Sequence, residues 1–171
     1  MAVDTRNDAK TVFAEENAGK REQLIEMLSK AYWMEIESVM SYIANSINPD
    51  GVRAQEIVEH LEEDIEDELG HAKSFGKRIK ELYGVVPGSL QFEAEQTYLQ
   101  PPDQQTDVVH VIKGVIEAEN GAIDYYQRII DFCDGFDLVT QDMLIDIQRD
   151  EQGHKRLFEG FLREYEAEGR A

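Results

Sequence analysis

The chain has 171 residues, 42% of them hydrophobic, and a formal net charge of −19 at pH 7. This length and composition predict one globular domain over residues 1–171 and exclude a disordered chain, because enough apolar surface is present to build a core. The charge argues against nucleic-acid binding, which depends on Lys and Arg neutralising phosphates, and the lack of any apolar stretch of roughly 18 residues argues against a membrane span.

Four long helices are predicted in chain order, and the prolines mark connections between them. Because proline breaks helix interiors, Pro49 indicates one connection, and a second lies between Gly84 and about Thr106, where the other three prolines fall. Elsewhere apolar residues recur with a period of 3.6. After an N-terminal extension of residues 1–17, we expect helices near 18–46, 52–83, 106–133 and 137–167, with the bundle covering about 18–167.

The lengths of the connections predict how these helices are arranged. The first and third connections are short, and short loops make neighbouring helices antiparallel, whereas the second connection has about 22 residues. The pattern therefore predicts an all-α protein, folded as an antiparallel four-helix bundle with one long crossover between the second and third helices.

The cysteine content limits the chemistry. Cys133 is the single cysteine, so an intrachain disulfide and metal sites built from several cysteines are excluded. The polar N-terminus MAVDTRNDAK is unlike a secretory signal, and both observations favour a cytoplasmic protein. The acidity fits a high-salt habitat, simple solubility, or attraction of cations.

Each predicted helix carries an apolar stripe that one carboxylate interrupts near its middle. In the third helix, for example, Glu119 follows Val115 by four residues and precedes Ala122 by three. Two of the interrupting acids belong to an E-x-G-H motif. A single E-x-x-H is expected by chance about half a time in this composition, so only its repetition on two stripes is informative. The motifs are Glu68–His71 in EDELGHAKSF and Glu151–His154 in RDEQGHKRLF, and the other two stripe acids are Glu35 and Glu119.

Four carboxylates that converge on one core call for counter-charges. They repel one another and raise each other's pKa, and no Lys or Arg stands on the stripes near them. Two divalent cations would balance the four charges and use the carboxylate oxygens as ligands. Residues three apart share a helix face, so Glu68 and Glu151 can each bridge two metals while the histidine of each motif ligates one of them. Such mixed ligands suit iron, manganese or zinc.

At these residues the chain resembles the ferritin-like di-iron carboxylate superfamily, in which this ligand pattern is known, and within it bacterioferritins and Dps-like ferritins most closely. The likeness covers about residues 22–162 and is clearest in MEIESVMSY, EDELGHAKSFGKRI and DMLIDIQRDEQGHKRLFE. It implies a ferroxidase that binds two iron ions per chain, with zinc or manganese as substitutes, oxidises Fe²⁺ with O₂ or H₂O₂, and stores ferric mineral in a shell. The implied catalytic and metal-binding residues are Glu35, Glu68, His71, Glu119, Glu151 and His154.

Three departures narrow this resemblance. Leu69 stands where bacterioferritins have the methionine that binds haem, so we expect no haem, and Ala122 stands where rubrerythrins have an extra glutamate. Only 17 residues follow His154, which leaves little room for the fifth helix of many 24-chain cages. This favours a homo-oligomeric shell of twelve chains, with a 24-mer or a dimer as alternatives. The intersubunit ligand pattern of DNA-protecting proteins is not found.

Several assignments stay open at this point. Glu37 competes with Glu35, and Glu117 competes with Glu119, although the stripes favour Glu35 and Glu119. Asp64, one turn before the first motif, is interpreted as a surface acid in preference to a guide for incoming cations.

Two tyrosines and one further histidine complete the interpretation. Tyr42 and Tyr126 each follow a stripe glutamate by seven residues, and we expect hydrogen-bond donors or core aromatics there. His110, three residues after Asp107, is interpreted as a chance match.

The functional alternatives are a non-storage di-metal oxidoreductase, such as a peroxidase or a manganese catalase, and a metal-free acidic bundle, which metal content after purification would reveal.

Overall fold

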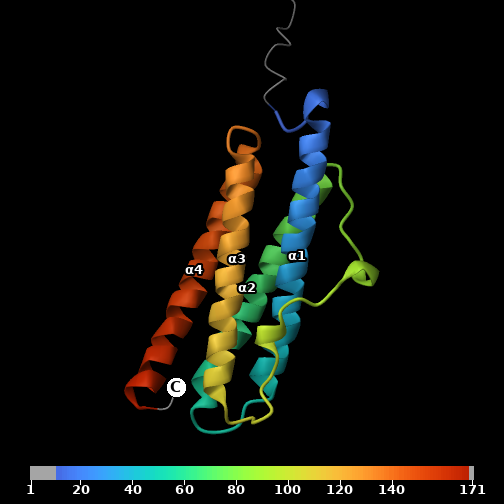
Figure 1. The fold of residues 1–171 in the computed structure, drawn as a ribbon. Helices are drawn as coiled ribbons and strands as arrows, with labels where there is room; N and C mark the ends of the chain where they lie inside the picture. Colours follow the sequence, from blue (N-terminus) through green and yellow to red (C-terminus); the bar gives the residue numbers. More distant parts are fainter. Residues whose placement is uncertain (1–10, 170–171) are drawn as a thin grey trace, which may run out of the picture.

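The computed structural model describes residues 11–169 and folds them mainly into four long helices, with no strand among those residues. They are α1 (Ala18–Ile47), α2 (Ala54–Glu81), α3 (Val108–Cys133) and α4 (Leu138–Ala167), and three short 3₁₀ segments are η2 (Glu15–Asn17), η3 (Ser89–Gln91) and η4 (Thr97–Leu99). Figure 1 shows the helices packed lengthwise, with the connection from α2 to α3 running along the outside of α1. The predicted all-α bundle with one long crossover is confirmed.

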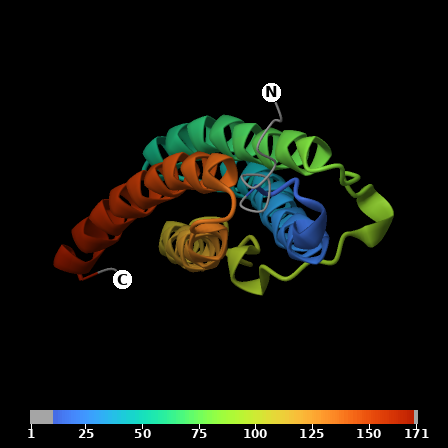
Figure 2. The same ribbon diagram turned by 90° about the horizontal axis from the view of Figure 1, so that it is seen from above.

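The helices form two antiparallel pairs that close around a common core. α1 packs against α2, and α3 packs against α4. Seen from above, α2 and α4 lie side by side along one edge of the bundle, while α1 and α3 lie along the other (Figure 2).

None of the helices formed by residues 11–169 is both long and apolar enough to cross a membrane. Residues 1–10 of the predicted N-terminal extension lie outside the described part of the chain.

The helix ends lie within two residues of the predicted bounds, and local geometry explains the differences. α2 ends at Glu81 because Tyr83 adopts a left-handed φ of 68° and the Gly84 N–H donates to the Ile79 carbonyl at 2.9 Å. α3 begins after Asp107, whose carboxylate accepts from the backbone N–H of His110 at 3.0 Å. The Asp107–His110 spacing, interpreted above as a chance match, is therefore a helix cap.

Two apolar clusters fill the bundle, one toward each end. Burying a large apolar side chain contributes about 1.5–3 kcal/mol, so these clusters supply most of the stability of the fold. In every helix the stripe acids named above fall between the residues of one cluster and those of the other. The first cluster includes Leu24, Leu28, Phe75, Ile79, Ile129 and Leu144, and the second includes Ile57, Leu61, Ile112, Val115 and Phe158.

The crossover is held against the bundle by polar contacts. The carboxylate of Glu37 accepts hydrogen bonds from the backbone N–H groups of Glu95 and Gln96, at 2.7 to 3.0 Å. Close approach to α3 is possible because residue 114 is glycine, since a Cβ there would stand 2.7 Å from the carbonyl oxygen of Tyr98. Glu37 is thus committed to holding the crossover.

A buried ion pair joins the end of α2 to the start of α4. Arg78 donates from Nη2 to both carboxylate oxygens of Asp137 at 2.8 Å, and from Nε to the Thr140 hydroxyl at 2.8 Å. Asp137 also caps α4 by accepting from the Thr140 N–H. Both charged residues are buried. The sequence does not predict this pair, because nothing in the spacing brings residues 78 and 137 together.

Arg78→Ala should lower the free energy of unfolding by about 3 kcal/mol or more, because it leaves the Asp137 carboxylate buried without its partner. Urea unfolding monitored by circular dichroism measures the change. Lys80→Ala, which truncates an exposed cation on the same turn of α2, is the control and should change stability by no more than about 0.5 kcal/mol. Equal effects of the two substitutions would contradict the role assigned to the ion pair.

Candidate metal centre

The structure brings all six predicted ligands together in the middle of the bundle, each helix contributing at least one. Their potential ligand atoms form two groups, within each of which the atoms lie no more than 4.8 Å apart. The groups share Glu68 and Glu151. One group is Glu35, Glu68, His71 and Glu151, and the other is Glu68, Glu119, Glu151 and His154.

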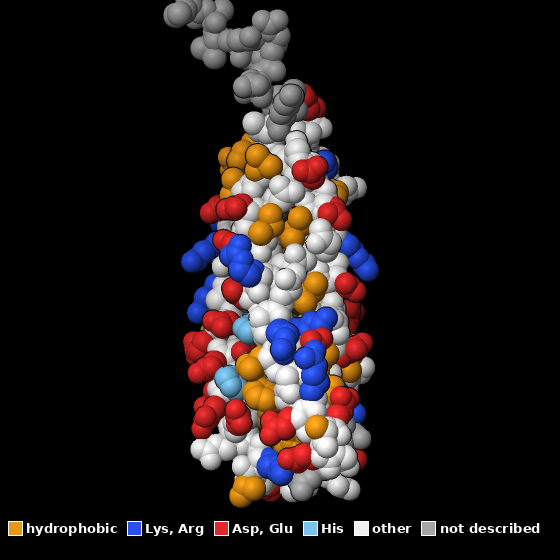
Figure 3. Space-filling model, turned by 90° about the vertical axis from the view of Figure 1, so that its left-hand side faces the viewer, with side chains coloured by type: hydrophobic (Ala, Val, Ile, Leu, Met, Phe, Trp, Pro, Cys, Tyr) orange, Lys and Arg blue, Asp and Glu red, His pale blue; other side chains and the backbone are white. Residues whose placement is uncertain are grey.

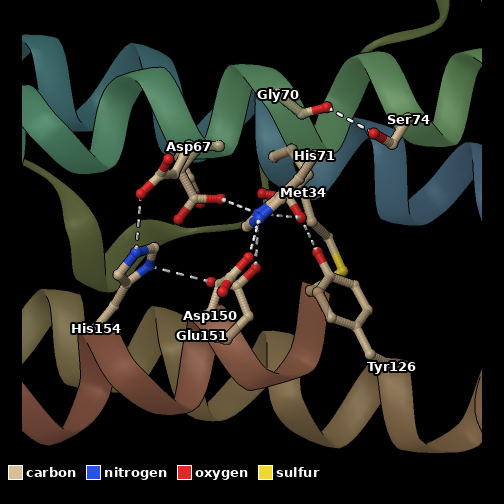
Figure 4. A network of polar contacts seen from close by, with 12 residues as sticks. Met34, Asp67, Gly70, His71, Ser74, Tyr126, Asp150, Glu151 and His154 are labelled. Carbon is tan, nitrogen blue, oxygen red and sulfur yellow. Dashed lines mark hydrogen bonds and ion pairs between the residues drawn. The ribbon is translucent and has the colours of Figure 1, made fainter. Parts of the chain in front are cut away.

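The two histidine rings point their Nδ1 atoms inward from opposite sides. Nδ1 of His71 lies 3.2 Å from one oxygen of Glu151, and Nδ1 of His154 lies 3.4 Å from the other. Their Nε2 atoms face outward, 3.4 Å from Asp150 and 3.5 Å from Asp67 respectively (Figure 4). A carboxylate behind a histidine fixes the orientation of the ring and increases its basicity, which is the arrangement found behind histidines that ligate metals.

Two tyrosines hold the outer carboxylates from across the bundle. The Tyr42 hydroxyl on α1 donates to Glu119 on α3 at 2.6 Å, and the Tyr126 hydroxyl on α3 donates to Glu35 on α1. Both rings are fully buried. Each bond anchors one of the two outer carboxylates of the centre. The expectation that these tyrosines are hydrogen-bond donors is met by this geometry.

The carboxylates of the centre are buried without a Lys or Arg partner. All four glutamates are at most 2% exposed, and in residues 11–169 no Lys or Arg forms an ion pair with them. Among the six residues of the centre, four buried atoms have no hydrogen-bond partner, namely Nδ1 of both histidines and both oxygens of Glu151. Buried polar atoms are normally satisfied, so this donor set fits divalent cations.

Burial and mutual repulsion set the protonation of the metal-free cluster. Burial, together with the charges of Glu68 and Glu151, raises the pKa of Glu35 well above its usual value, and the pKa of Glu119 is raised in the same way. Burial alone would also raise the pKa of Glu151, but its contacts with the two histidines prevail and lower it to about 2.

The histidines carry protons that offset the charge of Glu151. Burial disfavours the charged ring of His71, yet contacts with Glu151 and Glu68 prevail and raise its pKa to about 10. His154 behaves alike and reaches a pKa of about 9. A cation that binds Nδ1 must therefore displace a proton from the ring, so cation binding releases protons.

The structure separates the acids that the sequence left in competition. Glu35 and Glu119 lie in the cluster, whereas Glu37 binds the crossover backbone and Glu117 is exposed. The interpretation of Asp64 as a surface acid is wrong, because that residue is only 4% exposed and lies beside His154. Its position seven residues before His71, two turns back on the same helix face, was the available signal.

The comparisons with known proteins agree with this geometry. The model of a family described as "Ferritin-like domain" matches residues 25–167. A "DNA protection during starvation protein" from Pyrococcus furiosus is 28% identical over 146 residues, which are 82% of this chain and 77% of that protein. A bacterioferritin from Desulfovibrio desulfuricans is 26% identical over 147 residues, 83% of this chain and 78% of that protein.

Solved structures share the fold. The X-ray structure of the Desulfovibrio desulfuricans bacterioferritin, described by its di-iron site in different catalytic states, superposes with a TM-score of 0.76 at 25% identity over 88% of this chain and 84% of that one. A dodecameric thioferritin from Bacteroides fragilis also gives a TM-score of 0.76, at 24% identity over 91% of this chain and 97% of that one.

The metal-free protein should lose stability as the pH rises from about 6.5 to about 10. The raised pKa values of His71 and His154 mean that the folded state holds protons which the unfolded state releases above about pH 6.5. Their stabilisation is complete below that pH and is lost as the pH rises through 9 and 10. Glu151 acts oppositely, since its lowered pKa contributes stability that is lost as the pH falls toward 2.

Urea unfolding of chelator-treated protein at several pH values measures this dependence. His71→Gln should reduce the loss between neutral pH and pH 10, whereas His110→Gln, which replaces an exposed histidine, should leave it unchanged. A stability that is flat across this range in the unsubstituted protein would contradict the protonation assigned to the cluster.

Proposed function

This chain belongs to the ferritin-like domain family, and we propose that it is a ferroxidase, which binds Fe²⁺ as substrate at the centre described above and oxidises it with O₂ or H₂O₂. One observation carries the proposal. Two groups of ligand atoms share the carboxylates of Glu68 and Glu151, which is the arrangement that two adjacent cations need in order to be bridged.

The proposed chemistry requires two electrons from two neighbouring ions. Two bound Fe²⁺ ions would supply the electrons that reduce one O₂, with two protons, to H₂O₂, or one H₂O₂, with two protons, to two waters. The chain's own residues provide the ligands and the charge balance. Glu35 and His71 serve one position, and Glu119 and His154 serve the other, so each position has one terminal carboxylate and one imidazole.

The surrounding residues orient these ligands and exclude water. The Tyr42 and Tyr126 hydroxyls each donate to one oxygen of a terminal carboxylate and so fix the orientation of that carboxylate. The apolar clusters above and below keep the ligands out of bulk solvent. Because Nδ1 must give up its proton to become a ligand, loading of the centre should weaken as the pH falls.

The alternatives differ in metal and in product. The same donors suit manganese and zinc, so a non-storage oxidoreductase such as a peroxidase or a manganese catalase is the second candidate, which shares the centre. A metal-free acidic bundle is disfavoured by the unpartnered atoms of His71, Glu151 and His154. The absence of haem, expected from Leu69, stays a prediction.

We further propose that the chain stores iron inside a shell of about twelve copies and so removes Fe²⁺ and oxidant. Apolar side chains that this single chain leaves exposed support assembly, since Met40, Ile43 and Ile47 share one face of α1 and are 47%, 42% and 75% exposed. The net charge of −19 supports a role in removing iron and disfavours a role that requires contact with nucleic acid. A cytoplasmic location stays a prediction.

Anaerobic Fe²⁺ titration followed by air tests the ferroxidase. Absorbance of the ferric product should report saturation at about two Fe²⁺ per chain. Glu68→Ala and Glu119→Ala should each lower the initial rate more than about 10-fold, because each removes a ligand. Glu117→Ala is the matched control, since it removes an exposed glutamate from the same turn of α3. Equal rates in Glu119→Ala and Glu117→Ala would contradict the ligand assignment.

The mass of the assembly separates storage from the alternative oxidoreductase. Light scattering coupled to gel filtration should give a single species of about twelve chains, and added iron should sediment with the protein after air oxidation. Met40→Glu together with Ile47→Glu should reduce the mass, because charges on that face of α1 oppose burial. A stable dimer that turns over peroxide without retaining iron would instead support the non-storage enzyme.

A further inference from the structure

A cleft opens between α1, the crossover and α3, away from the metal centre. Its volume is about 640 Å³, which lies in the range of sites for small organic ligands. On α1 its lining residues are spaced by three and four, as in Glu26, Lys30 and Trp33, so one face of that helix forms a wall. In Figure 2 the crossover passes beside α1 and reaches α3, so segments that are distant in sequence surround this place.

Two glycines of α3 explain why the cleft opens where it does. At Gly114 the crossover touches the helix, since a Cβ there would stand 2.7 Å from the carbonyl oxygen of Tyr98. Among the described residues, a Cβ at Gly121 would meet only the Tyr98 hydroxyl, at an ordinary contact distance of 3.7 Å. The crossover backbone therefore stands away from α3 at the level of Gly121, and the missing side chain of that glycine adds room.

Three aromatic side chains line the cleft, one from each of the surrounding segments. They are Trp33 on α1, Tyr98 on the crossover and Tyr125 on α3, and all three are partly exposed. Aromatic rings bind apolar groups and, through their faces, cations. The Lys30 ammonium of the chain itself lies over the Tyr125 ring, 5.8 Å from its centre. The cleft is thus suited to a group that is both organic and positively charged.

The charges around the cleft are mainly acidic. Three exposed acids line it and form no ion pair with any residue from 11 to 169, namely Glu26, Glu93 and Asp124. Of the two lining cations, Lys30 already pairs with Glu95, at 3.0 Å. Burial and neighbouring carboxylates, among them Glu37, raise the pKa of Tyr98 on the cleft wall. The potential in the cleft is therefore negative, although Arg128, the other lining cation, opposes it.

Exposed acids alone would not distinguish this place from the rest of the surface. Figure 3 shows the side of the molecule that faces left in Figure 1, where acidic side chains are also numerous, with basic side chains and scattered apolar side chains among them. In the cleft the acids instead border three aromatic rings and a concave volume large enough for an organic molecule. The combination, and not the acidity, marks the cleft as a binding site.

We propose that this cleft binds a small aromatic cation, with its ring among the three aromatic side chains and its charge toward Glu26, Glu93 and Asp124. Cation–π contacts and the excess of carboxylates both favour positive charge, whereas a hydrated metal ion would leave the aromatic rings unused. The inference goes beyond the proposed function and requires no metal in the dinuclear centre. Every lining residue of α1 precedes Met40, so the cleft is separate from the face proposed for assembly.

The fluorescence of Trp33, the single tryptophan of the chain, reports binding in the cleft directly. N-methylquinolinium, an aromatic cation, should quench this fluorescence until the site is saturated. Quinoline, which is uncharged at neutral pH and has nearly the same shape, should bind about 5-fold more weakly, because it lacks the charge that the carboxylates and ring faces attract. Titrations of the full chain at neutral pH without added iron give both affinities.

Substitutions in the cleft separate specific binding from general attraction to an acidic protein. Glu26→Gln together with Asp124→Asn should weaken N-methylquinolinium binding about 5-fold, because two attractive charges are removed. Glu22→Gln together with Asp142→Asn removes two exposed acids that do not line the cleft. This matched control should keep the affinity within about 2-fold of the unsubstituted chain.

Two further variants test the volume and the sign of the charge. Gly121→Leu should abolish saturable quenching, because the added side chain fills the cleft, and circular dichroism checks that this variant is folded. Arg128→Gln, which keeps the cleft open, should strengthen binding of N-methylquinolinium, because it removes a like charge. The charge variants test the proposal by themselves if Gly121→Leu does not fold.

Three results would overturn the proposal. Quenching that rises linearly with N-methylquinolinium and never saturates would mean that the probe only collides with the ring of Trp33. Equal affinities in the double variant of the cleft acids and in its matched control would remove their role. Saturable quenching by naphthoate that Arg128→Gln abolishes would show that the cleft takes anions instead. None of these measurements involves Fe²⁺ oxidation, so they leave the proposed ferroxidase to its own test.

Discussion

Four glutamate side chains, one from each helix, lie at one depth of the bundle, and the electrostatic cost of keeping them there governs the rest of the structure. No Lys or Arg of residues 11–169 pairs with them, so the balance depends on protons, on two histidines, and on cations. In the metal-free protein the pKa is about 10 for His71 and about 9 for His154, so both rings are protonated at neutral pH. Cations that replace these protons bring more charge to the same oxygens, which explains why the site is suited to divalent ions.

The apolar clusters and the polar contacts stabilise different parts of this arrangement. The clusters at both ends position the helices, while hydrogen bonds from Tyr42 and Tyr126 orient the terminal carboxylates. More distant polar groups act on the backbone. Glu37 fixes the crossover, and the Arg78–Asp137 pair fixes the junction of α2 with α4. Acids that are near neighbours in sequence thus have unrelated tasks, because adjacent positions on a helix face different surroundings.

The two E-x-G-H halves of the centre are near-repeats of each other, so a buried position at which they differ is informative. Several corresponding positions around the centre carry the same residue, such as Leu61 with Leu144 and Phe75 with Phe158, so the presence of Asp64 opposite Ile147 stands out as an excess charge. That comparison needs only the offset of 83 residues and the burial of both positions. An acidic chain conceals such a residue in sequence, since most of its carboxylates are solvated.

The sequence alone determined the four helices, the long crossover and the six residues of the candidate centre, because helical periodicity places each stripe acid on the buried face and the E-x-G-H motifs repeat there. It also favoured Glu35 and Glu119 over Glu37 and Glu117, but did not assign the remaining acids. Only the tertiary structure decided that Glu37 binds the crossover, that Asp64 is buried beside His154, and that Arg78 pairs with Asp137. The physical reason is that periodicity specifies the face of a helix, whereas the partner on that face comes from a distant part of the chain.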